Sequence, residues 1–223
     1  MPFWRALCIY VPVVTKDEMF AAIFVQRRRL ADMLDGLNDD EWNTASLCAG
    51  WKVRDVVGHL LSILEIPIGR FVLNVIKARN FDKYSDRVAR QIGARDPKSL
   101  VASYRALADK RFAPPIVGPI APLTDVFVHS RDIERPIGKQ SNLDSDGLRT
   151  VLDYVCGGRA RGFVPPSRTR GLRFEATDLG WSLGDGPVVL GTGEAIMMAV
   201  ASRRSALAEL SGEGAIVLRQ RVS

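Results

Sequence analysis

Four long segments of this 223-residue chain carry apolar residues at the spacing of one helix face. This periodicity constrains the fold more than any other feature, because each apolar stripe must be buried against another element. Start signals support it: Thr15 and Glu18 form a capping box, and Asp96 followed by Pro97 opens another helix. Four such helices with short to medium links predict a four-helix bundle. The helices are expected from Thr15 to Gly36, from Trp51 to Leu64 with a continuation after Pro67 as far as Ile76, from Asp96 to Phe112, and from Leu123 to Ile133.

The last third of the chain differs and predicts a small α+β unit. A further helix is expected near 146–156, and the glycine- and arginine-rich residues 157–171 indicate a linker or loop. Beyond it the sequence predicts strands at 172–176, 187–190 and 215–218, with a helix over 194–210 before the last strand. The expected fold class is therefore mostly α, with a bundle over residues 15–157 and a small α+β C-terminal domain over 171–223.

The cysteines and the charge limit the setting. Cys8, Cys48 and Cys156 are odd in number and form no C-x-x-C pair, which argues against a disulfide framework and favours the cytoplasm. Residues 1–14 hold a short apolar run broken by Pro12, and an irregular leader is expected there. No stretch reaches the ~18 apolar residues of a membrane span. A net charge of +6 admits nucleic acid as a partner, but that function rests on charge alone.

The chain has only two histidines, and each falls inside a predicted bundle helix. His59 lies in the second helix. His129 lies in the fourth, four residues after Asp125 and three before Asp132, so these three share one face. Bundles build metal sites from such side chains on facing helices. Two imidazoles and one carboxylate suit zinc or another divalent metal, and three protein ligands leave a position open for chemistry. The alternative is that both histidines are ordinary helix residues without a metal.

Three blocks of sequence carry a resemblance to a known family. The first is CAGWKVRDVVGHL at residues 48–60, and the second runs from Pro122 to Gly138. The third comprises ATDLGW at residues 176–181, Gly186-Pro187, and the segment from Arg203 to Gly212. Together they resemble the mycothiol-dependent maleylpyruvate isomerase family, whose members are DinB-like metal-binding four-helix bundles. The likeness spans roughly Leu30 to Leu218.

The resemblance implies a ligand set and a chemistry. Its metal ligands would be His59, Asp125 and His129, with aspartate where the family's pattern has glutamate. The cofactors implied are a divalent metal, with Zn²⁺ as the first candidate, and mycothiol as the thiol cosubstrate. A metal-bound thiol is deprotonated, and the thiolate is the nucleophile. The predicted function is therefore a metal-dependent isomerase or S-transferase that adds a mycothiol-like thiol to an electrophilic carbon.

Arginines suit substrate carboxylates because they pair with them bidentately. The resemblance points to Arg203 and Arg204 as catalytic residues, although Ser202 stands where the family has glycine. Arg54 and Arg131 are further candidates, and surface salt bridges are the alternative for each arginine.

Two aspartates near the histidines are candidates for orienting a ligand imidazole: Asp55 and Asp132. Asp55 equally suits a helix cap. Cys48 is expected to be a small buried residue rather than a catalytic thiol.

A second class of function stays open beside the enzyme: a non-enzymatic DinB-like binding or regulatory module with a structural metal or none. A pocket open to the metal ligands would favour the enzyme, and a filled bundle centre would favour the module. The expected partners are a small thiol and a small electrophile, with carboxylates among the candidates. Neither nucleic acid nor a membrane is expected as a partner, and the chain is expected to be a monomer or homodimer.

Overall fold

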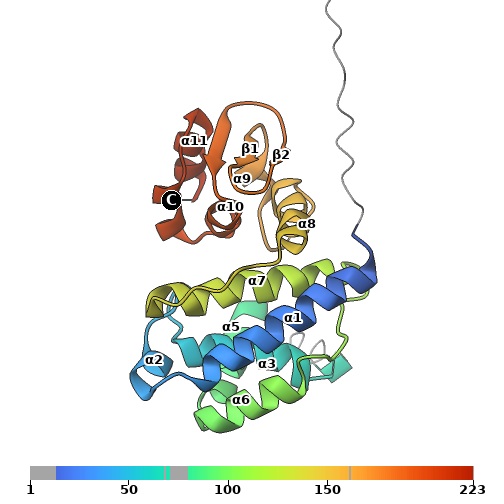
Figure 1. The fold of residues 1–223 in the computed structure, drawn as a ribbon, viewed down its shortest axis with the longest axis vertical. Coiled ribbons are helices and arrows are strands. Elements are labelled where there is room, and N and C mark those ends of the chain that lie inside the picture. The colour runs from blue at the N-terminus through green and yellow to red at the C-terminus, as the bar shows by residue number, and fades with distance from the viewer. Residues whose placement is uncertain (1–13, 68, 71–79, 161, 223) are drawn as a thin grey trace, which may run out of the picture.

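The computed structural model describes residues 14–67, 69–70, 80–160 and 162–222. The expected leader at 1–14 therefore lies outside the described residues apart from Val14. Four helices form the bundle, and α1 and α3 each pack against α6 and α7 (Figure 1). The predicted mostly α bundle is confirmed. Its helices are α1 (Lys16–Asp35), α3 (Val53–Glu65), α6 (Pro97–Ala106) and α7 (Ile120–Glu134).

The predicted start signals act as expected. The Glu18 backbone N–H donates to the Thr15 hydroxyl at 3.2 Å, and the Thr15 N–H donates to the Glu18 carboxylate at 2.7 Å. These bonds satisfy amides that the first helical turn leaves without partners. The Asp96 carboxylate accepts from the Ser99 N–H at 3.1 Å, with proline in the first turn.

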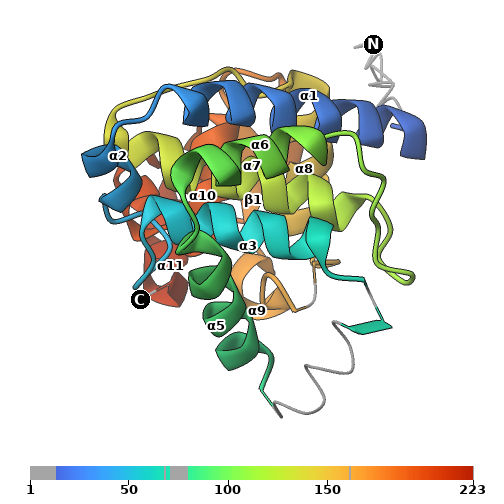
Figure 2. The same ribbon diagram turned by 90° about the horizontal axis from the view of Figure 1, so that it is seen from below.

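Two elements between the bundle helices were not predicted: the short α2 (Asp39–Asn43) and α5 (Phe81–Gly93). α5 lies alongside α3 (Figure 2). The helices approach closely because Gly58 has no side chain; a Cβ there would lie 2.1 Å from the Ala89 carbonyl oxygen. Most of the continuation expected after Pro67 lies outside the described residues.

The C-terminal unit packs on α7 (Figure 1). Its three-stranded sheet has the order β2-β1-β3, with β1 antiparallel to β2 and parallel to β3. The α+β character is as predicted, and the domain boundaries of 15–157 and 171–223 stay a prediction. The elements are α8 (Ser145–Cys156), α9 (Pro166–Thr169), β1 (Arg173–Ala176), β2 (Trp181–Leu183), β3 (Val188–Gly191), α10 (Gly193–Val200) and α11 (Glu213–Val222), with 3₁₀ helices η1 (Arg135–Ile137) and η2 (Arg204–Glu209).

Two local predictions in this unit were wrong. The strand expected at 215–218 lies inside α11. Ala215 and Leu218 are buried while Ile216 is 57% exposed, which is helical spacing rather than strand alternation. The helix expected over 194–210 ends at Val200, because the chain turns at Ser202 with φ of 70°. It continues only as the 3₁₀ helix η2.

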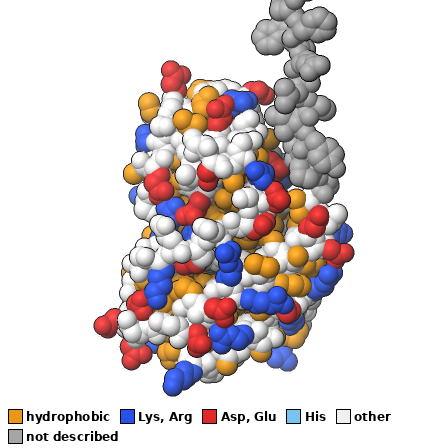
Figure 3. Space-filling view, viewed as in Figure 1, with side chains coloured by type: hydrophobic (Ala, Val, Ile, Leu, Met, Phe, Trp, Pro, Cys, Tyr) orange, Lys and Arg blue, Asp and Glu red, His pale blue; other side chains and the backbone are white. Residues whose placement is uncertain are grey.

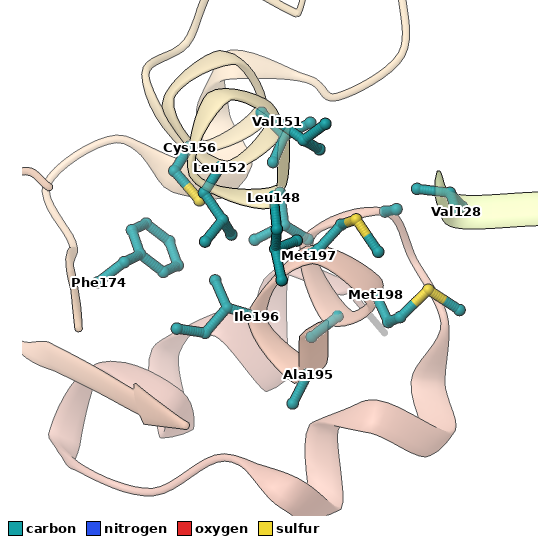
Figure 4. Close-up of a cluster of buried hydrophobic side chains, with 14 of the residues drawn as sticks. Val128, Leu148, Val151, Leu152, Cys156, Phe174, Ala195, Ile196, Met197 and Met198 are labelled. Carbon is teal, nitrogen blue, oxygen red and sulfur yellow. The ribbon is translucent and has the colours of Figure 1, made fainter. Parts of the chain in front are cut away.

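The core of the C-terminal unit joins α8 to α10. In Figure 4, Leu148 and Leu152 of α8 face Ile196 and Met197 of α10, and Val128 of α7 lies beside them. This shared core attaches the C-terminal unit to the helix that carries His129. α10 is consequently held against the outer side of α7.

The surface seen in Figure 3 mixes acidic and basic side chains instead of gathering one sign. On the bundle, Arg105 pairs with Asp32 at 3.0 Å and Arg28 pairs with Asp109. Such pairs account for part of the basic composition without a nucleic-acid partner. Within the described residues, no helix combines the length and apolar character needed to cross a membrane.

Candidate metal centre

The structure brings His59, Asp125 and His129 together in the bundle. His59 Nε2 lies 3.4 Å from Asp125 Oδ1, and His129 Nε2 lies 3.5 Å from the same oxygen. One ligand atom from each residue falls within 4.8 Å of the other two. The two imidazole rings meet edge to face, with centroids 4.9 Å apart.

Helix geometry explains the convergence. Asp125 and His129 are four residues apart on α7 and therefore stack on one face. α3 packs against that face and supplies His59. Trp51, just before α3, places its ring 5.3 Å from the His59 ring and donates its indole N–H to Asp86 at 2.7 Å. The tryptophan thus packs against the histidine from the side of α5.

The Nδ1 atom of each imidazole also has a polar partner. His129 Nδ1 lies 2.8 Å from Asp132 Oδ2, and His59 Nδ1 lies 3.3 Å from the Ser85 hydroxyl. A proton on each Nδ1 would leave each Nε2 as a lone-pair donor directed at Asp125. The candidate role of Asp132 in orienting an imidazole agrees with this contact. Asp55 instead caps α3, where it accepts the Lys52 N–H at 2.9 Å.

Arg203 reaches this cluster, whereas Arg204 is exposed. Arg203 Nε donates to Asp132 Oδ1 at 2.8 Å, and its Nη2 donates to Asp132 Oδ2. The same Nη2 lies 3.5 Å from Cys48 Sγ. A left-handed turn at Ser202 directs the arginine: the Ser202 N–H donates to Ala199 O and the Arg203 N–H to Met198 O. This is the Schellman pattern, in which the left-handed position favours glycine.

The other candidate arginines lie elsewhere in the fold. Arg54 donates to the Gly93 and Arg95 carbonyl oxygens and so ties α3 to α5. Arg131 is buried and pairs with Glu134 and with Glu194, the latter at 2.7 Å. Both have structural partners of their own.

Charges inside the cluster are strongly coupled. Burial lowers the pKa of His129, but the nearby Asp125 and a hydrogen bond with Asp132 outweigh it and raise that pKa to about 10. Burial raises the pKa of Asp125, yet the adjacent His129 and His59 hold it below its usual range. The pKa of Asp132 is likewise lowered, because hydrogen bonds from Arg203 and His129 outweigh burial. Without a metal, a proton on His129 balances the carboxylates.

The donor set fits a divalent metal. Ligands about 2.0–2.1 Å from a tetrahedral zinc lie about 3.4 Å from one another, which is close to the two distances at Asp125 Oδ1. The contact between His129 and Asp132 is the carboxylate–histidine arrangement that commonly supports a metal ligand. Cys48, His129 and Asp132 also lie within 4.8 Å of one another. That second group is less suited to a cation, because Arg203 already pairs with Asp132.

A pocket of about 470 Å³ opens onto the cluster, and His59 and Asp125 form part of its wall. Side chains from α3, α5, α7, α8, the segment before α7 and the segment after α8 contribute to the rest of it. The His59 and Asp125 side chains are 14% and 22% exposed, whereas that of His129 is 8% exposed. The open side of the cluster therefore faces the pocket.

Sequence reasoning missed Ser85, because α5 itself was not predicted. The signal was present: Asn80 caps α5 by accepting the Lys83 N–H, and Tyr84, Val88 and Ile92 recur every four residues on its buried face. Cys48 is half-buried beside Arg203, and its sulfur lies within 4.8 Å of a ring nitrogen of His129. It is therefore a polar neighbour of the cluster rather than a simple core residue.

The fold and the site define a class: a DinB-like four-helix bundle with a His–Asp–His cluster and a small α+β unit. Residues 24–113 match the family model described as the mycothiol maleylpyruvate isomerase N-terminal domain. The chain therefore carries a domain of that family, and the resemblance seen in its sequence is confirmed.

Solved structures with the same fold are known. The chain is similar to the crystal structure of the mycothiol-dependent maleylpyruvate isomerase, with a TM-score of 0.62 and 13% sequence identity over 90% of this chain and 94% of that one. A histidine-to-alanine mutant of that enzyme gives the same values. No curated protein matches the chain in sequence.

Proposed function

We propose that this protein is a metal-dependent isomerase or S-transferase that uses mycothiol or a similar low-molecular-weight thiol. The observation that carries the proposal is the convergence of His59, Asp125 and His129 beside a pocket whose wall includes the first two. An open pocket beside three ligand atoms favours an enzyme over a binding module with a structural metal. The mycothiol dependence of the structurally similar enzyme supports mycothiol as the thiol.

In this proposal His59, Asp125 and His129 hold the metal through Nε2, a carboxylate oxygen and Nε2. A divalent metal held there would supply the charge that keeps a coordinating thiol deprotonated. Asp132 is a positioning residue, because it fixes the His129 ring through Nδ1. Arg203 holds Asp132 in turn, with two donors on its two oxygens.

The pocket would hold the electrophile beside the thiolate. The sulfur forms a bond to an electrophilic carbon of a conjugated double bond, and the π electron pair moves toward the activating carbonyl. Rotation about the new single bond followed by loss of the thiol completes an isomerisation. Uptake of a proton at the adjacent carbon instead completes a transfer, with the adduct as product.

We propose a positioning role for Arg203 rather than direct contact with substrate, because its guanidinium is engaged with Asp132. A catalytic role for Arg204, which is exposed, stays a prediction. A cytoplasmic location stays one as well, as do the monomeric or homodimeric state and the absence of a nucleic-acid partner.

The test is metal-dependent turnover. Purified protein is stripped with chelator, reloaded with Zn²⁺ and assayed with mycothiol and a neutral conjugated electrophile. We expect activity to follow reloading and to be lost in His129→Ala and Asp125→Ala but not in Asp109→Ala, which alters only an exposed pair with Arg28. Turnover that is equal in the stripped protein would overturn the proposal.

Thermal unfolding with and without chelator separates the enzyme from the structural-metal alternative. Most of the stability of a bundle comes from its packed apolar faces, so we expect a small shift of the midpoint. Collapse of the fold on metal removal would favour a structural metal.

A further inference from the structure

We infer that the pocket beside His59 and Asp125 takes an uncharged, largely apolar electrophile rather than a carboxylate. The inference rests on the proposed function and names the class of its second substrate. It runs against the expectation that arginines bind a substrate carboxylate. The observation behind it is the chemistry of the pocket wall.

The described residues of the wall are mainly apolar. α3 and the residue that follows it supply two isoleucines, the segment between α6 and α7 supplies a phenylalanine and two prolines, and the segment after α8 supplies another phenylalanine. Small-molecule sites are commonly about 300–1,000 Å³ and mostly apolar, and this pocket of about 470 Å³ is of that kind. The apolar side chains that carry the argument are Ile63, Ile66, Phe112, Pro114, Pro115 and Phe163.

The described part of the wall offers an anion no lysine or arginine side chain. The ionisable side chains among the described lining residues are those of His59, Asp125 and Tyr154. A carboxylate that left water for the apolar part of this wall would lose its hydration without gaining a lysine or arginine partner among the described lining residues.

Three of the four candidate arginines have partners away from the pocket, and the fourth, Arg204, is exposed and is not among the described lining residues. Arg203 is bound to Asp132, and Arg131 is bound to Glu134 and Glu194. Arg54 is bound to backbone carbonyls of α5 and the residues after it. Each would have to leave an existing partner to meet a substrate carboxylate.

A dialkyl maleate has the features that this pocket selects, and it reports both proposed reactions. The thiolate sulfur bonds to one alkene carbon while the π pair moves to the other, which carries the second ester. Protonation of that carbon by water gives the thioether adduct. Rotation followed by loss of the thiolate gives the dialkyl fumarate. No oxidant or reductant is needed.

The experiment compares maleate with its dimethyl, diethyl and dibutyl esters, using zinc-loaded protein and mycothiol. Each kcat/KM is divided by the uncatalysed rate constant of the same compound, so that intrinsic reactivity cancels. We expect the normalised value to rise at least about tenfold from dimethyl to dibutyl ester, because added methylenes are buried. The normalised kcat/KM of maleate should be about 100-fold or more below that of the dibutyl ester. A normalised value for maleate equal to or above that of the esters would overturn the inference.

A matched pair of variants tests the location. Ile63→Lys places a cation in the wall, whereas Ile216→Lys adds the same charge to an exposed position of α11. We expect Ile63→Lys to lower the normalised kcat/KM for dibutyl maleate about tenfold, and to reduce the ratio of that value to the value for maleate. Ile216→Lys should match the wild type in both. Identical substrate preference in both variants would place the electrophile elsewhere.

Binding of unreactive analogues keeps the inference separate from the proposed function. Dibutyl succinate and succinate lack the double bond, and calorimetry with metal-free wild-type protein measures their affinities without turnover. We expect dibutyl succinate to bind at least about tenfold more tightly, on the same methylene-burial ground. If no compound turns over but this preference holds, the proposed function fails and the character of the pocket stands. If succinate binds more tightly, the pocket inference fails whatever the activity.

Discussion

Replacing Asp132 by asparagine separates the positioning of His129 from the folding of the bundle. The Asp132 side chain is fully buried, meets His129 Nδ1 at 2.8 Å and accepts two hydrogen bonds from Arg203. An asparagine at this position would keep the shape of the side chain and lose its charge. Two effects are expected, one on the metal and one on stability.

The effect on metal binding is expected because Asp132 orients His129, a proposed metal ligand. Loss of a carboxylate that orients a ligand histidine typically costs about 10–100-fold in metal affinity. We expect Asp132→Asn to weaken zinc binding by that factor, measured by competition with a chromophoric chelator well below the unfolding midpoint. Activity at saturating zinc should fall less than affinity does.

The stability effect follows from the buried ion pair. Removing one partner of such a pair costs about 3–5 kcal/mol, because the other charge stays buried without a counter-charge. The Arg203 side chain is 12% exposed and keeps a bond to the Ala201 carbonyl, so we expect about 3 kcal/mol. For a chain of this size that lowers the thermal midpoint by about 6–12 °C.

The double variant Asp132→Asn/Arg203→Met tells the two effects apart. It removes the unpaired charge and should recover much of the stability without recovering metal affinity. Asp109→Asn is the control, since its exposed pair with Arg28 contributes about 0–1 kcal/mol and does not touch the cluster. Wild-type zinc affinity in Asp132→Asn would refute the reasoning.

Three further outcomes follow from the same structure. Ser202→Gly should stabilise the protein by about 1 kcal/mol in chemical denaturation, because φ of 70° strains a residue with a side chain; a loss of stability would contradict the turn. Gly58→Ala should cost about 1–3 kcal/mol, because the new Cβ would meet the Ala89 carbonyl, and an unchanged urea midpoint would disprove the close approach. Zinc binding near neutral pH should release close to one proton from His129, whose raised pKa keeps it protonated without metal. The affinity of the protein for Zn²⁺ should therefore increase with pH up to about 10. A calorimetric heat of zinc binding that does not depend on the ionisation enthalpy of the buffer would contradict this.

The convergence of the cluster could be predicted because it depends on regular helix geometry. Asp125 and His129 share a face at i,i+4 spacing, and His59 lies on a second apolar helix that must pack in the same bundle. The sequence did not distinguish Arg203 from Arg204. That choice depends on a left-handed turn at Ser202, and serine gives little sign of such a turn, whereas glycine would.

Short apolar runs and sparse stripes were the other source of error. Residues 215–218 are all apolar, and a four-residue run fits a strand or a helix equally well until its neighbours decide which side chains are buried. α5 has only a narrow apolar stripe among charged residues, so its helix and the contact from Ser85 to His59 were missed. The described wall of the pocket is assembled from segments far apart in the sequence, and no local pattern reveals such an assembly.

Cobalt substitution tests the central claim most directly, because Co²⁺ reports its own ligands. Metal-free protein is titrated with Co²⁺ and followed by visible absorption, with His129→Ala and Asp109→Ala alongside. The account predicts one tight Co²⁺ per chain with a four-coordinate spectrum, and a sulfur-to-cobalt charge-transfer band when mycothiol is added. Asp109→Ala should behave as the wild type, and His129→Ala should lose both signals. Weak or multiple binding that His129→Ala leaves unchanged, or a spectrum that does not respond to the thiol, would contradict the account.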